Sequence, residues 1–446
     1  MYDVIIIGVS EIWTKSEKVR KLLIRRLVNN IKRRISDARI EIRRGRLIVR
    51  PYKEEYIDAL RKTFGVKYCA PAWVIPTDYE KIKNKLFELV KDKSGKFKIT
   101  VNRVWKEFSL TSIELGRKLA NEIKLNFETL NPELKSPDFE IFIELHKDVT
   151  FIFDKKINAY DGYPVGSEGK ALALFSGGID SPVAAWFAAK RGIAVDLLFL
   201  NLAGPVHEAL VYKVYEKLRE WIPTAKLYVI EAINLIEKIV MNVRSGYRQI
   251  VYKVFLYKIA EKVAEKLNIK VLITGESLGQ VSTQTLDSLV LLEEFAKIPI
   301  LRPLIALNKD EIKEYAREIG TLDFSERVPE VCMLEKHSTA SPRKEILLEE
   351  LEKVHIDIDE LVNSLREAKV QHEEDISYLI PRNIPKDKLH IVDLEKSFIE
   401  DDICGKKVLF LCPSGITAYY FAKKYREKGI EAYFLDYKTA KRLGYI

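Results

Sequence analysis

Residues 174–184 read LFSGGIDSPVA, and this stretch decides the fold of the chain. An apolar run ends at Phe175, two glycines and an aspartate follow, and a helix is expected to start near Ser181. Glycine lets the backbone approach a ligand closely, and a helix N-terminus attracts anions through its unpaired N–H groups. Ser181 is placed to cap that helix, with Pro182 at its first position. The stretch is therefore either an ordinary strand-to-helix turn or a phosphate cradle, and it lacks the Gly-Lys-Ser/Thr ending of a Walker A loop.

The chain that follows this loop alternates strands and helices. Apolar strands are expected at 171–175, 194–200, 226–232 and 271–276, with helices centred near residues 185, 212 and 257. Nearly continuous apolar strands separated by helices predict a doubly wound parallel sheet. Ligands of such sheets bind beyond the carboxyl ends of the strands, which is where the glycines fall. A helix over 342–354 and a second helix reaching about residue 370 are expected next.

Two smaller α+β units are expected before the loop, and a small α/β unit after the helices. The first unit reads strand–helix–strand, with a hairpin from Ile40, and the second alternates helices and strands as far as two closing strands. A Gly-rich polar segment at 159–170 is typical of a linker. The tail returns to strand–helix–strand over 407–412, 417–429 and 432–437.

Positive charge is concentrated at the N-terminus. The chain has a net charge of +9, and residues 1–60 hold 15 Lys and Arg against 8 Asp and Glu. Such a surface is either the footprint of a nucleic-acid partner or a solubilising face. No apolar run reaches the ~18 residues of a membrane span, and the first residues are typical of a strand rather than a signal peptide. We therefore expect a cytoplasmic protein without a membrane partner.

Several motifs, in this order along the chain, resemble the tRNA uridine 4-sulfurtransferase (4-thiouridine synthetase) family. SGGIDS at 176–181 resembles the pyrophosphate (PP) loop of ATP pyrophosphatases, and TSIELGRKLA at 111–120 resembles part of a THUMP domain. Further similar stretches are FLNLAGPVHE (199–208), LITGESLGQVSTQTL (272–286), ILRPLIALNKDEI (300–312) and GTLDFSERVPEVCMLEKHSTA (320–340). The resemblance implies a ferredoxin-like domain (1–57), a tRNA-binding THUMP domain (58–158), a PP-loop ATP-pyrophosphatase domain (165–345), a helical linker (346–372) and a shortened rhodanese-like domain (373–446).

The reaction that the resemblance implies is the synthesis of 4-thiouridine in tRNA. ATP, with Mg²⁺, adenylates the C4 oxygen of the uridine at position 8, and a persulfide sulfur then displaces AMP. The implied partners are tRNA, a cysteine desulfurase persulfide or sulfide as the sulfur source, and a second copy of the chain. Two alternatives stay open: sulfur transfer for the thiazole of thiamine, and a tRNA-binding protein with a vestigial ATP site.

The resemblance also assigns site residues. Asp180 either acts in catalysis, for example through Mg²⁺ on the ATP phosphates, or orients loop amides as a structural cap. No motif in the sequence predicts direct metal ligands. The implied ATP-binding residues are Leu174, Phe175, Ser176, Gly177, Gly178, Asp180, Ser181, Lys253, Gly275 and Gln284.

Each of the four cysteines has a separate interpretation. The resemblance implies that Cys412 carries a persulfide and that Cys332 is the resolving thiol, although an isolated cysteine is otherwise typical of an apolar core. The loop after Cys412 lacks the arginine usual in rhodaneses, and the tail is shorter than the usual module. Cys404 is either a second resolving thiol or has no role, and Cys69 is expected in a core. The chain has few cysteines and no Cys-x-x-Cys pair, so we expect it to have neither a disulfide framework nor an iron–sulfur cluster.

Overall fold

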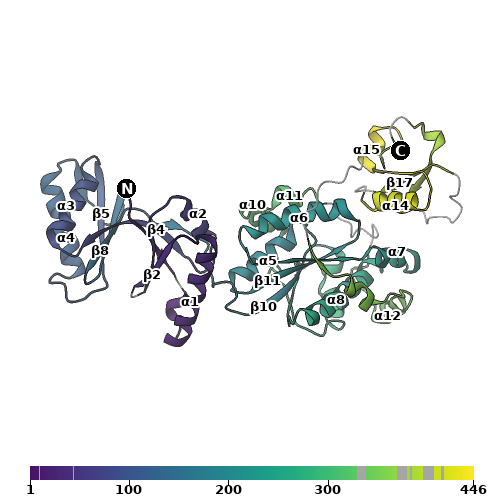
Figure 1. Cartoon of the computed structure of the whole chain (residues 1–446), viewed down its shortest axis with the longest axis horizontal. Helices are drawn as coiled ribbons and strands as arrows, with labels where there is room; N and C mark the ends of the chain where they lie inside the picture. The colour runs from purple at the N-terminus through teal and green to yellow at the C-terminus, as the bar shows by residue number, and fades with distance from the viewer. Residues whose placement is uncertain are drawn as a thin grey trace. The chain divides into compact units, whose positions relative to one another are not determined.

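The computed structural model describes residues 1–9, 11–43, 45–328, 338–368, 379–381, 384–394, 406–412 and 416–446. The chain folds into two compact units (Figure 1). The first comprises residues 1–167 and 190–192, and the second comprises 168–189 and 193–446. Among the described residues, no helix combines the length and the apolar composition needed to cross a membrane.

The first unit begins with a ferredoxin-like arrangement. Its strands lie in the order β2-β3-β1-β4, with every neighbouring pair antiparallel. The expected boundary at residue 57 falls inside α2, and β4, which follows, pairs with β1. The elements are β1 (Val4–Gly8), α1 (Glu17–Arg34), β2 (Arg39–Arg43), β3 (Arg46–Arg50), α2 (Glu55–Arg61) and β4 (Tyr68–Pro76), with a 3₁₀ turn η1 (Glu11–Thr14) after β1.

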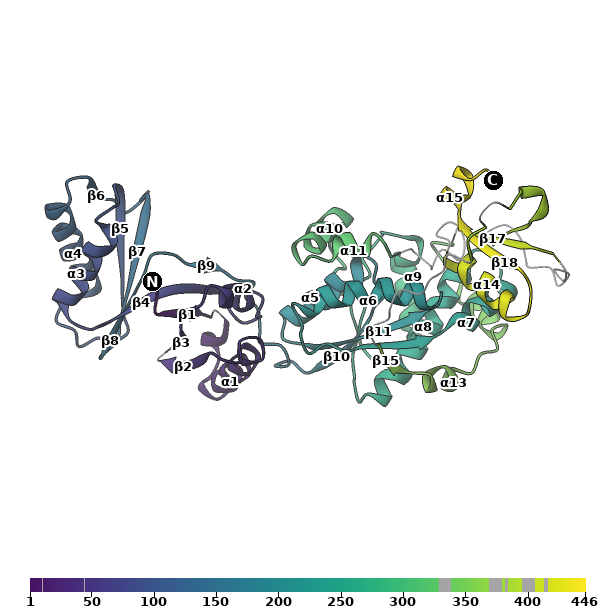
Figure 2. The same cartoon turned by 45° about the horizontal axis from the view of Figure 1, so that its top comes forward.

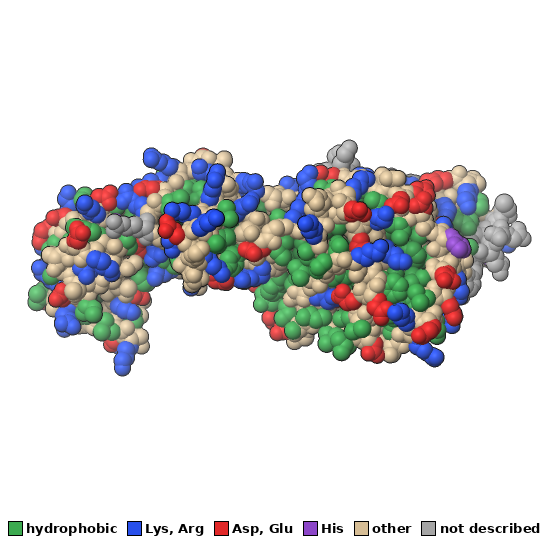
Figure 3. Space-filling model, turned by 90° about the horizontal axis from the view of Figure 1, so that it is seen from below, with side chains coloured by type: hydrophobic (Ala, Val, Ile, Leu, Met, Phe, Trp, Pro, Cys, Tyr) green, Lys and Arg blue, Asp and Glu red, His purple; other side chains and the backbone are tan. Residues whose placement is uncertain are grey.

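Strand β4 continues into the second half of this unit, where it pairs with β8. All the strands from β1 to β9 therefore form one nine-stranded sheet (Figure 2). Asp78 caps α3, and Thr111 with Glu114 forms a capping box at α4, which explains why both helices start where they do. Lys and Arg side chains are spread over the visible face of this unit (Figure 3). The elements are α3 (Tyr79–Val90), β5 (Gly95–Arg103), α4 (Ser112–Asn126), β6 (Leu130–Pro132), β7 (Phe139–Leu145), β8 (Val149–Phe153) and β9 (Ile157–Asn158).

The second unit contains the doubly wound sheet predicted from the sequence. Its strands lie in the order β14-β13-β10-β11-β12-β15, and every pairing is parallel except that of β15 with β12. The strands are β10 (Lys170–Leu174), β11 (Ala194–Asn201), β12 (Leu227–Glu231), β13 (Leu272–Ile273), β14 (Ile300–Leu301) and β15 (Arg366–Glu367). The helices are α5 (Asp180–Lys190), α6 (Pro205–Arg219), α7 (Ile233–Asn242), α8 (Arg248–Lys266), η2 (Ser282–Gln284), α9 (Leu286–Glu293), α10 (Lys309–Glu318), α11 (Leu322–Ser325), α12 (Lys344–Glu352) and α13 (Ile358–Asn363).

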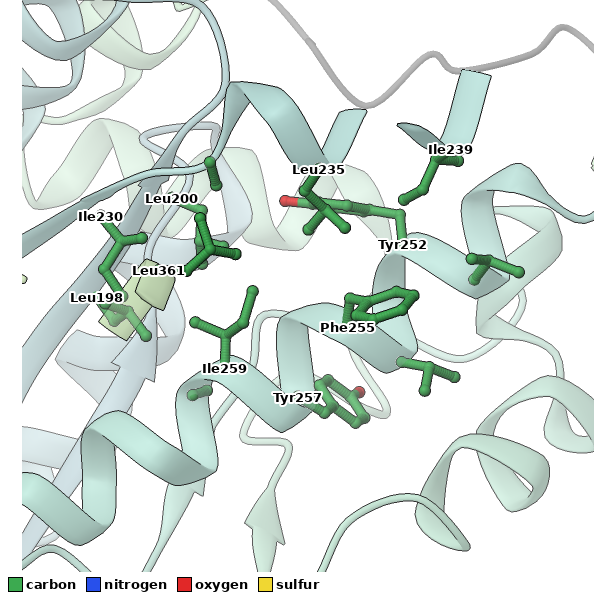
Figure 4. Close-up of a cluster of buried hydrophobic side chains, with 14 of the residues drawn as sticks. Leu198, Leu200, Ile230, Leu235, Ile239, Tyr252, Phe255, Tyr257, Ile259 and Leu361 are labelled. Carbon is green, nitrogen blue, oxygen red and sulfur yellow. The ribbon is translucent and has the colours of Figure 1, made fainter. Parts of the chain in front are cut away.

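The segment expected as a helical linker is part of this unit's core. Leu361 of α13 is buried in the same apolar cluster as α8 and the sheet (Figure 4). Leu347 of α12 belongs to this cluster as well. The helix expected to reach residue 370 ends at Asn363, and β15 then adds an antiparallel edge strand. A two-residue strand carries too little periodicity to be seen in a sequence, which is why this expectation was wrong.

The tail forms a small parallel sheet in the order β16-β17-β18. The expected strand–helix–strand pattern is therefore confirmed. The elements are η4 (Lys386–Lys388), β16 (His390–Asp393), β17 (Val408–Cys412), α14 (Ile416–Glu427), β18 (Ala432–Asp436) and α15 (Tyr437–Arg442).

Candidate functional site

The glycine-rich loop lies at the point where the strand order of the second unit reverses. From β10 the chain passes through α5 to β11 on one side, and it later returns through α8 to β13 on the other side of β10. Residues 175–179 follow β10 at its carboxyl end, and residues 274–284 follow β13 at the same edge. Parallel sheets of this kind bind ligands in the crevice at this reversal.

Internal hydrogen bonds shape the loop itself. The Ser176 N–H donates to Ser181 Oγ over 3.2 Å, and the Gly178 N–H donates to Ser176 Oγ over 3.3 Å. Helix α5 begins at Asp180, so Ser181 and Pro182 are its second and third residues. The expectation that Ser181 caps the helix is therefore wrong, because its hydroxyl oxygen accepts from an N–H group on the opposite side of the loop.

Two glycines are required by close packing at the loop. Gly177 has a φ of +74°, and a Cβ there would lie 2.9 Å from Val211 Cγ2 on α6. A Cβ on Gly275 would lie 3.0 Å from the carbonyl carbon of Asp180 and 3.1 Å from the Ser181 nitrogen. Gly275 thus lets the end of β13 pack against the start of α5, which brings the two loops of the site together.

Asp180 is held by two side chains from distant segments. Its Oδ1 accepts from Lys309 Nζ over 2.7 Å, and its Oδ2 accepts from Gln280 Nε2 over 3.0 Å. Lys309 is the first residue of α10, whose capping box joins Asn308 and Glu311. Sequence reasoning missed Lys309 and Gln280, although the Asn-x-x-Glu capping signal could have placed Lys309 at a helix start.

Lys253 lies in a buried polar cluster around Glu276. Its Nζ donates to Glu276 Oε1 over 2.7 Å and to the carbonyl of Thr283 over 3.5 Å. Burial alone would raise the pKa of the Glu276 carboxyl, but the Lys253 ammonium and the Arg302 guanidinium outweigh it and lower that pKa to about 2. The carboxylate is therefore ionised throughout the physiological range, and it fixes the ammonium of Lys253 next to the loop that contains Gln284.

The remaining residues predicted to bind ATP are held in place by hydrogen bonds and by apolar packing. Gln284 closes the loop after β13, because its Oε1 accepts from the Ser277 N–H over 3.4 Å and its carbonyl accepts from the Gly279 N–H over 2.8 Å. Phe175 is 2% exposed, and its N–H donates to the carbonyl of Leu198. Leu174, at the end of β10, is partly buried against the apolar core. The structure therefore brings the ten predicted residues to the ends of β10 and β13 and to the facing side of α8.

Cys412 is buried at the carboxyl end of β17. It is 4% exposed, and its sulfur accepts from the Ala418 N–H in the first turn of α14 over 3.4 Å. Cys69 is fully buried in β4, as expected for a core residue, and burial raises the pKa of its thiol to about 12. Cys332 and Cys404 lie outside the described residues.

The chain on either side of the Cys332 segment contacts the site. Before it, Ser325 Oγ donates to the carbonyl of Gly178 over 3.4 Å. After it, Thr285 Oγ1, next to Gln284, donates to the carbonyl of Ala340 over 2.6 Å. Within the described part of the chain, no group of three or more His, Cys, Asp or Glu side chains could hold a metal ion.

Three family models match the chain in the order of its domains. They are the ThiI ferredoxin-like domain at residues 4–70, the THUMP domain at 76–154 and the thiamine biosynthesis protein ThiI at 166–356.

Curated relatives match over most of their length. A probable tRNA sulfurtransferase of Sulfurisphaera tokodaii is 35% identical over 367 residues, which cover 81% of this chain and 98% of the relative. A tRNA sulfurtransferase of Thermoplasma volcanium is 33% identical over 468 residues and covers 98% of this chain and 96% of the relative.

Two solved structures share the fold. A 4-thiouridine synthetase crystallised with RNA and ATP has a TM-score of 0.74 at 29% identity, covering 82% of this chain and 99% of the other. A Pyrococcus horikoshii protein has a TM-score of 0.56 at 25% identity, covering 71% of this chain and 99% of the other.

Proposed function

The chain belongs to the tRNA sulfurtransferase family, and from this premise we propose that it makes 4-thiouridine in tRNA at the expense of ATP. The observation that carries the proposal is the SGGIDS loop at the strand-order reversal, with Asp180 and Lys309 paired beside it. This geometry suits a triphosphate, because loop N–H groups, the α5 N-terminus and the ammonium groups of Lys253 and Lys309 offer donors and positive charge.

The proposed reaction has two displacement steps. The C4 oxygen of the uridine at position 8 attacks the α-phosphorus of ATP, pyrophosphate leaves, and the N3 proton is lost. A sulfur nucleophile then attacks C4, and AMP leaves with the former carbonyl oxygen. Adenylation is needed because a carbonyl oxygen is a poor leaving group, and the cationic side chains stabilise the charge that develops on the phosphates.

Mg²⁺ would enter with the ATP phosphates rather than through a protein carboxylate. Both oxygens of Asp180 are engaged, one by Lys309 and one by Gln280, so this residue does not fit the role of a direct metal ligand. We therefore propose that Asp180 positions the Lys309 ammonium.

We propose that sulfur arrives on Cys412 as a persulfide. The Ala418 N–H at the start of α14 already donates to the Cys412 sulfur, and helix N-termini favour a thiolate. The terminal persulfide sulfur attacks C4, and Cys332 then attacks the Cys412 sulfur, which releases 4-thiouridine and leaves a Cys332–Cys412 disulfide. A cellular thiol reductant reverses that disulfide before the next turnover. Contacts of Ser325 and Thr285 beside the Cys332 segment support this role.

Substrate tRNA would bind the first unit through its cationic surface. Contacts from Lys and Arg to phosphate fix the register of a nucleic acid without reading its sequence. The exposed cations of α1 are Lys18, Lys21, Arg25, Arg26, Lys32 and Arg33.

We further propose that the chain acts in the cytoplasm and forms a homodimer. A dimer interface would cover the apolar side chains that are exposed around β14 and α9. These residues are Leu278, Val281, Leu286, Val290, Leu301 and Ile305.

The test is a thiolation assay with two sulfur sources. Wild type, Cys332→Ser and Cys412→Ser are incubated with unmodified tRNA and MgATP, with either sulfide or a persulfide-charged cysteine desulfurase, and nucleosides are identified by mass spectrometry. We expect sulfide to support the wild type and Cys412→Ser equally, and the desulfurase to support the wild type alone. If no variant forms 4-thiouridine although tRNA binds, the proposal fails and a non-catalytic tRNA-binding protein is favoured.

Sulfur transfer to the thiazole of thiamine is a second candidate function. It is favoured because the family model that matches residues 166–356 is that of a thiamine biosynthesis protein. Thiazole formation that needs Cys412 but not Asp180 would support this role, because sulfur delivery alone makes no use of the ATP site.

A further inference from the structure

Glu276 is the hub of a buried network that the proposed mechanism leaves unexplained. The residue is 6% exposed and lies three positions after the end of β13, next to Gly275. Its carboxylate accepts hydrogen bonds from the side chains of four residues: Lys253 (2.7 Å), Tyr257 (3.0 Å), Thr274 (3.0 Å) and Arg302 (2.8 Å). These donors come from α8, from the end of β13 and from the segment after β14, so one carboxylate ties together three elements around the site.

Lys253 depends on this network for its orientation. Its side chain has four rotatable bonds, and ordering such a chain costs up to about 2 kcal/mol. Glu276 offers a full negative charge at 2.7 Å, and the other partner of the ammonium, the carbonyl of Thr283, lies at 3.5 Å. Because only 16% of the Lys253 side chain is exposed, water screens the ion pair weakly. Glu276 is therefore the main determinant of where the ammonium points.

Arg302 and Tyr257 hold Glu276 in turn. Arg302 donates through Nε to Glu276 and through another nitrogen to Glu293 on α9. The Tyr257 hydroxyl contacts both carboxylate oxygens, at 3.1 and 3.0 Å. A carboxylate fixed from three sides cannot rotate away from Lys253, so the network orients the ammonium before any ligand binds.

We propose that Glu276 is a positioning residue that aims the Lys253 ammonium at the phosphates of ATP. This inference rests on the proposed function, since it takes Lys253 to contact the nucleotide. It predicts that Glu276 affects ATP binding only through Lys253. A residue that merely stabilised the fold would instead affect ATP binding independently of Lys253.

The test is a double-mutant cycle on ATP binding, measured by calorimetry without tRNA. Glu276→Gln and Lys253→Met should each weaken ATP binding about tenfold, the usual value of one charge-assisted contact. The double variant should bind no more weakly than Lys253→Met alone. Glu350→Gln is the matched control, because Glu350 is also a buried carboxylate. It accepts hydrogen bonds from Arg244 and Lys353, and not from the residues that surround Glu276. Glu350→Gln should leave ATP binding unchanged.

Additive losses in the double variant would overturn the assignment, and so would an equal loss in Glu350→Gln. If Glu276→Gln does not fold, Tyr257→Phe replaces it in the cycle, with an expected loss of about threefold that also disappears in the Lys253→Met background. A wild-type protein that bound no ATP would overturn the proposed function as well. Wild-type binding that Glu276→Gln left intact would overturn this inference alone.

Discussion

Replacing Arg366 with methionine removes a guanidinium that joins three elements of the second unit. Arg366 lies on β15 and donates to Glu208 of α6 over 2.7 and 2.5 Å and to Glu231 of β12 over 2.7 Å. Glu208 is 1% exposed, so the substitution leaves a buried carboxylate without its partner. Such a loss typically costs about 3–5 kcal/mol. Because the Arg366 side chain is 39% exposed, water screens part of the pair, and we expect roughly 2 kcal/mol.

Thermal unfolding measured by calorimetry checks this value. For a unit of this size, the expected loss corresponds to a fall in Tm of about 4–8 °C. Lys217→Met is the control, because Lys217 lies on α6, the helix that carries Glu208. Both side chains of its ion pair with Glu220 are exposed, so this pair should contribute less than about 0.5 kcal/mol. Adding Glu208→Gln to Arg366→Met should recover part of the loss. The reasoning is refuted if Arg366→Met costs no more than Lys217→Met, or if the second substitution lowers stability further.

Three further predictions concern the loop and the buried titratable groups. Gly177→Ala should cost roughly 1–3 kcal/mol in unfolding free energy and weaken ATP binding, because of its φ of +74° and the 2.9 Å approach to Val211; urea unfolding and calorimetry measure both. Burial lowers the pKa of His207 to about 4, so between about pH 6.5 and pH 4 the unfolded chain gains a proton that the native chain does not. The free energy of unfolding of the wild type should therefore fall by about 2–3 kcal/mol over this window relative to that of His207→Gln, measured by parallel urea titrations. Equal slopes of unfolding free energy against pH in the two proteins would contradict the account. Cys69, whose pKa is raised to about 12 by burial, should resist iodoacetamide at pH 8 in the native protein and react in urea, as peptide mass spectrometry will show.

Local signals were sufficient to predict most of the fold. The apolar strands at 171–175 and 194–200 form β10 and β11, and the hairpin expected from Ile40 forms β2 and β3. These predictions succeed because strand alternation, buried apolar runs and capping residues act within a few positions of one another. The predicted ATP-binding residues also gather at one edge of the sheet, because the carboxyl ends of neighbouring parallel strands meet there.

The partners of the site residues could not be predicted in the same way. Asp180 and Lys309 are 129 positions apart, and Arg366 and Glu208 are 158 positions apart. Such pairs depend on tertiary packing, which no local pattern encodes. Ser181 shows the same limit on a smaller scale, since the helix starts two residues earlier than expected and the Ser181 hydroxyl oxygen accepts from the Ser176 N–H across the loop instead of from an N–H of the helix.

The most direct test of the account compares the amounts of AMP and of 4-thiouridine that the wild type and Asp180→Asn form. Purified protein is incubated with unmodified tRNA, MgATP and sulfide, and both products are quantified in the same reaction. The account predicts equal amounts of AMP and 4-thiouridine for the wild type. It predicts a loss of about 100-fold or more in both for Asp180→Asn, with tRNA binding unchanged. Thiouridine formed without AMP, or AMP formed in equal amounts by both proteins, would contradict it.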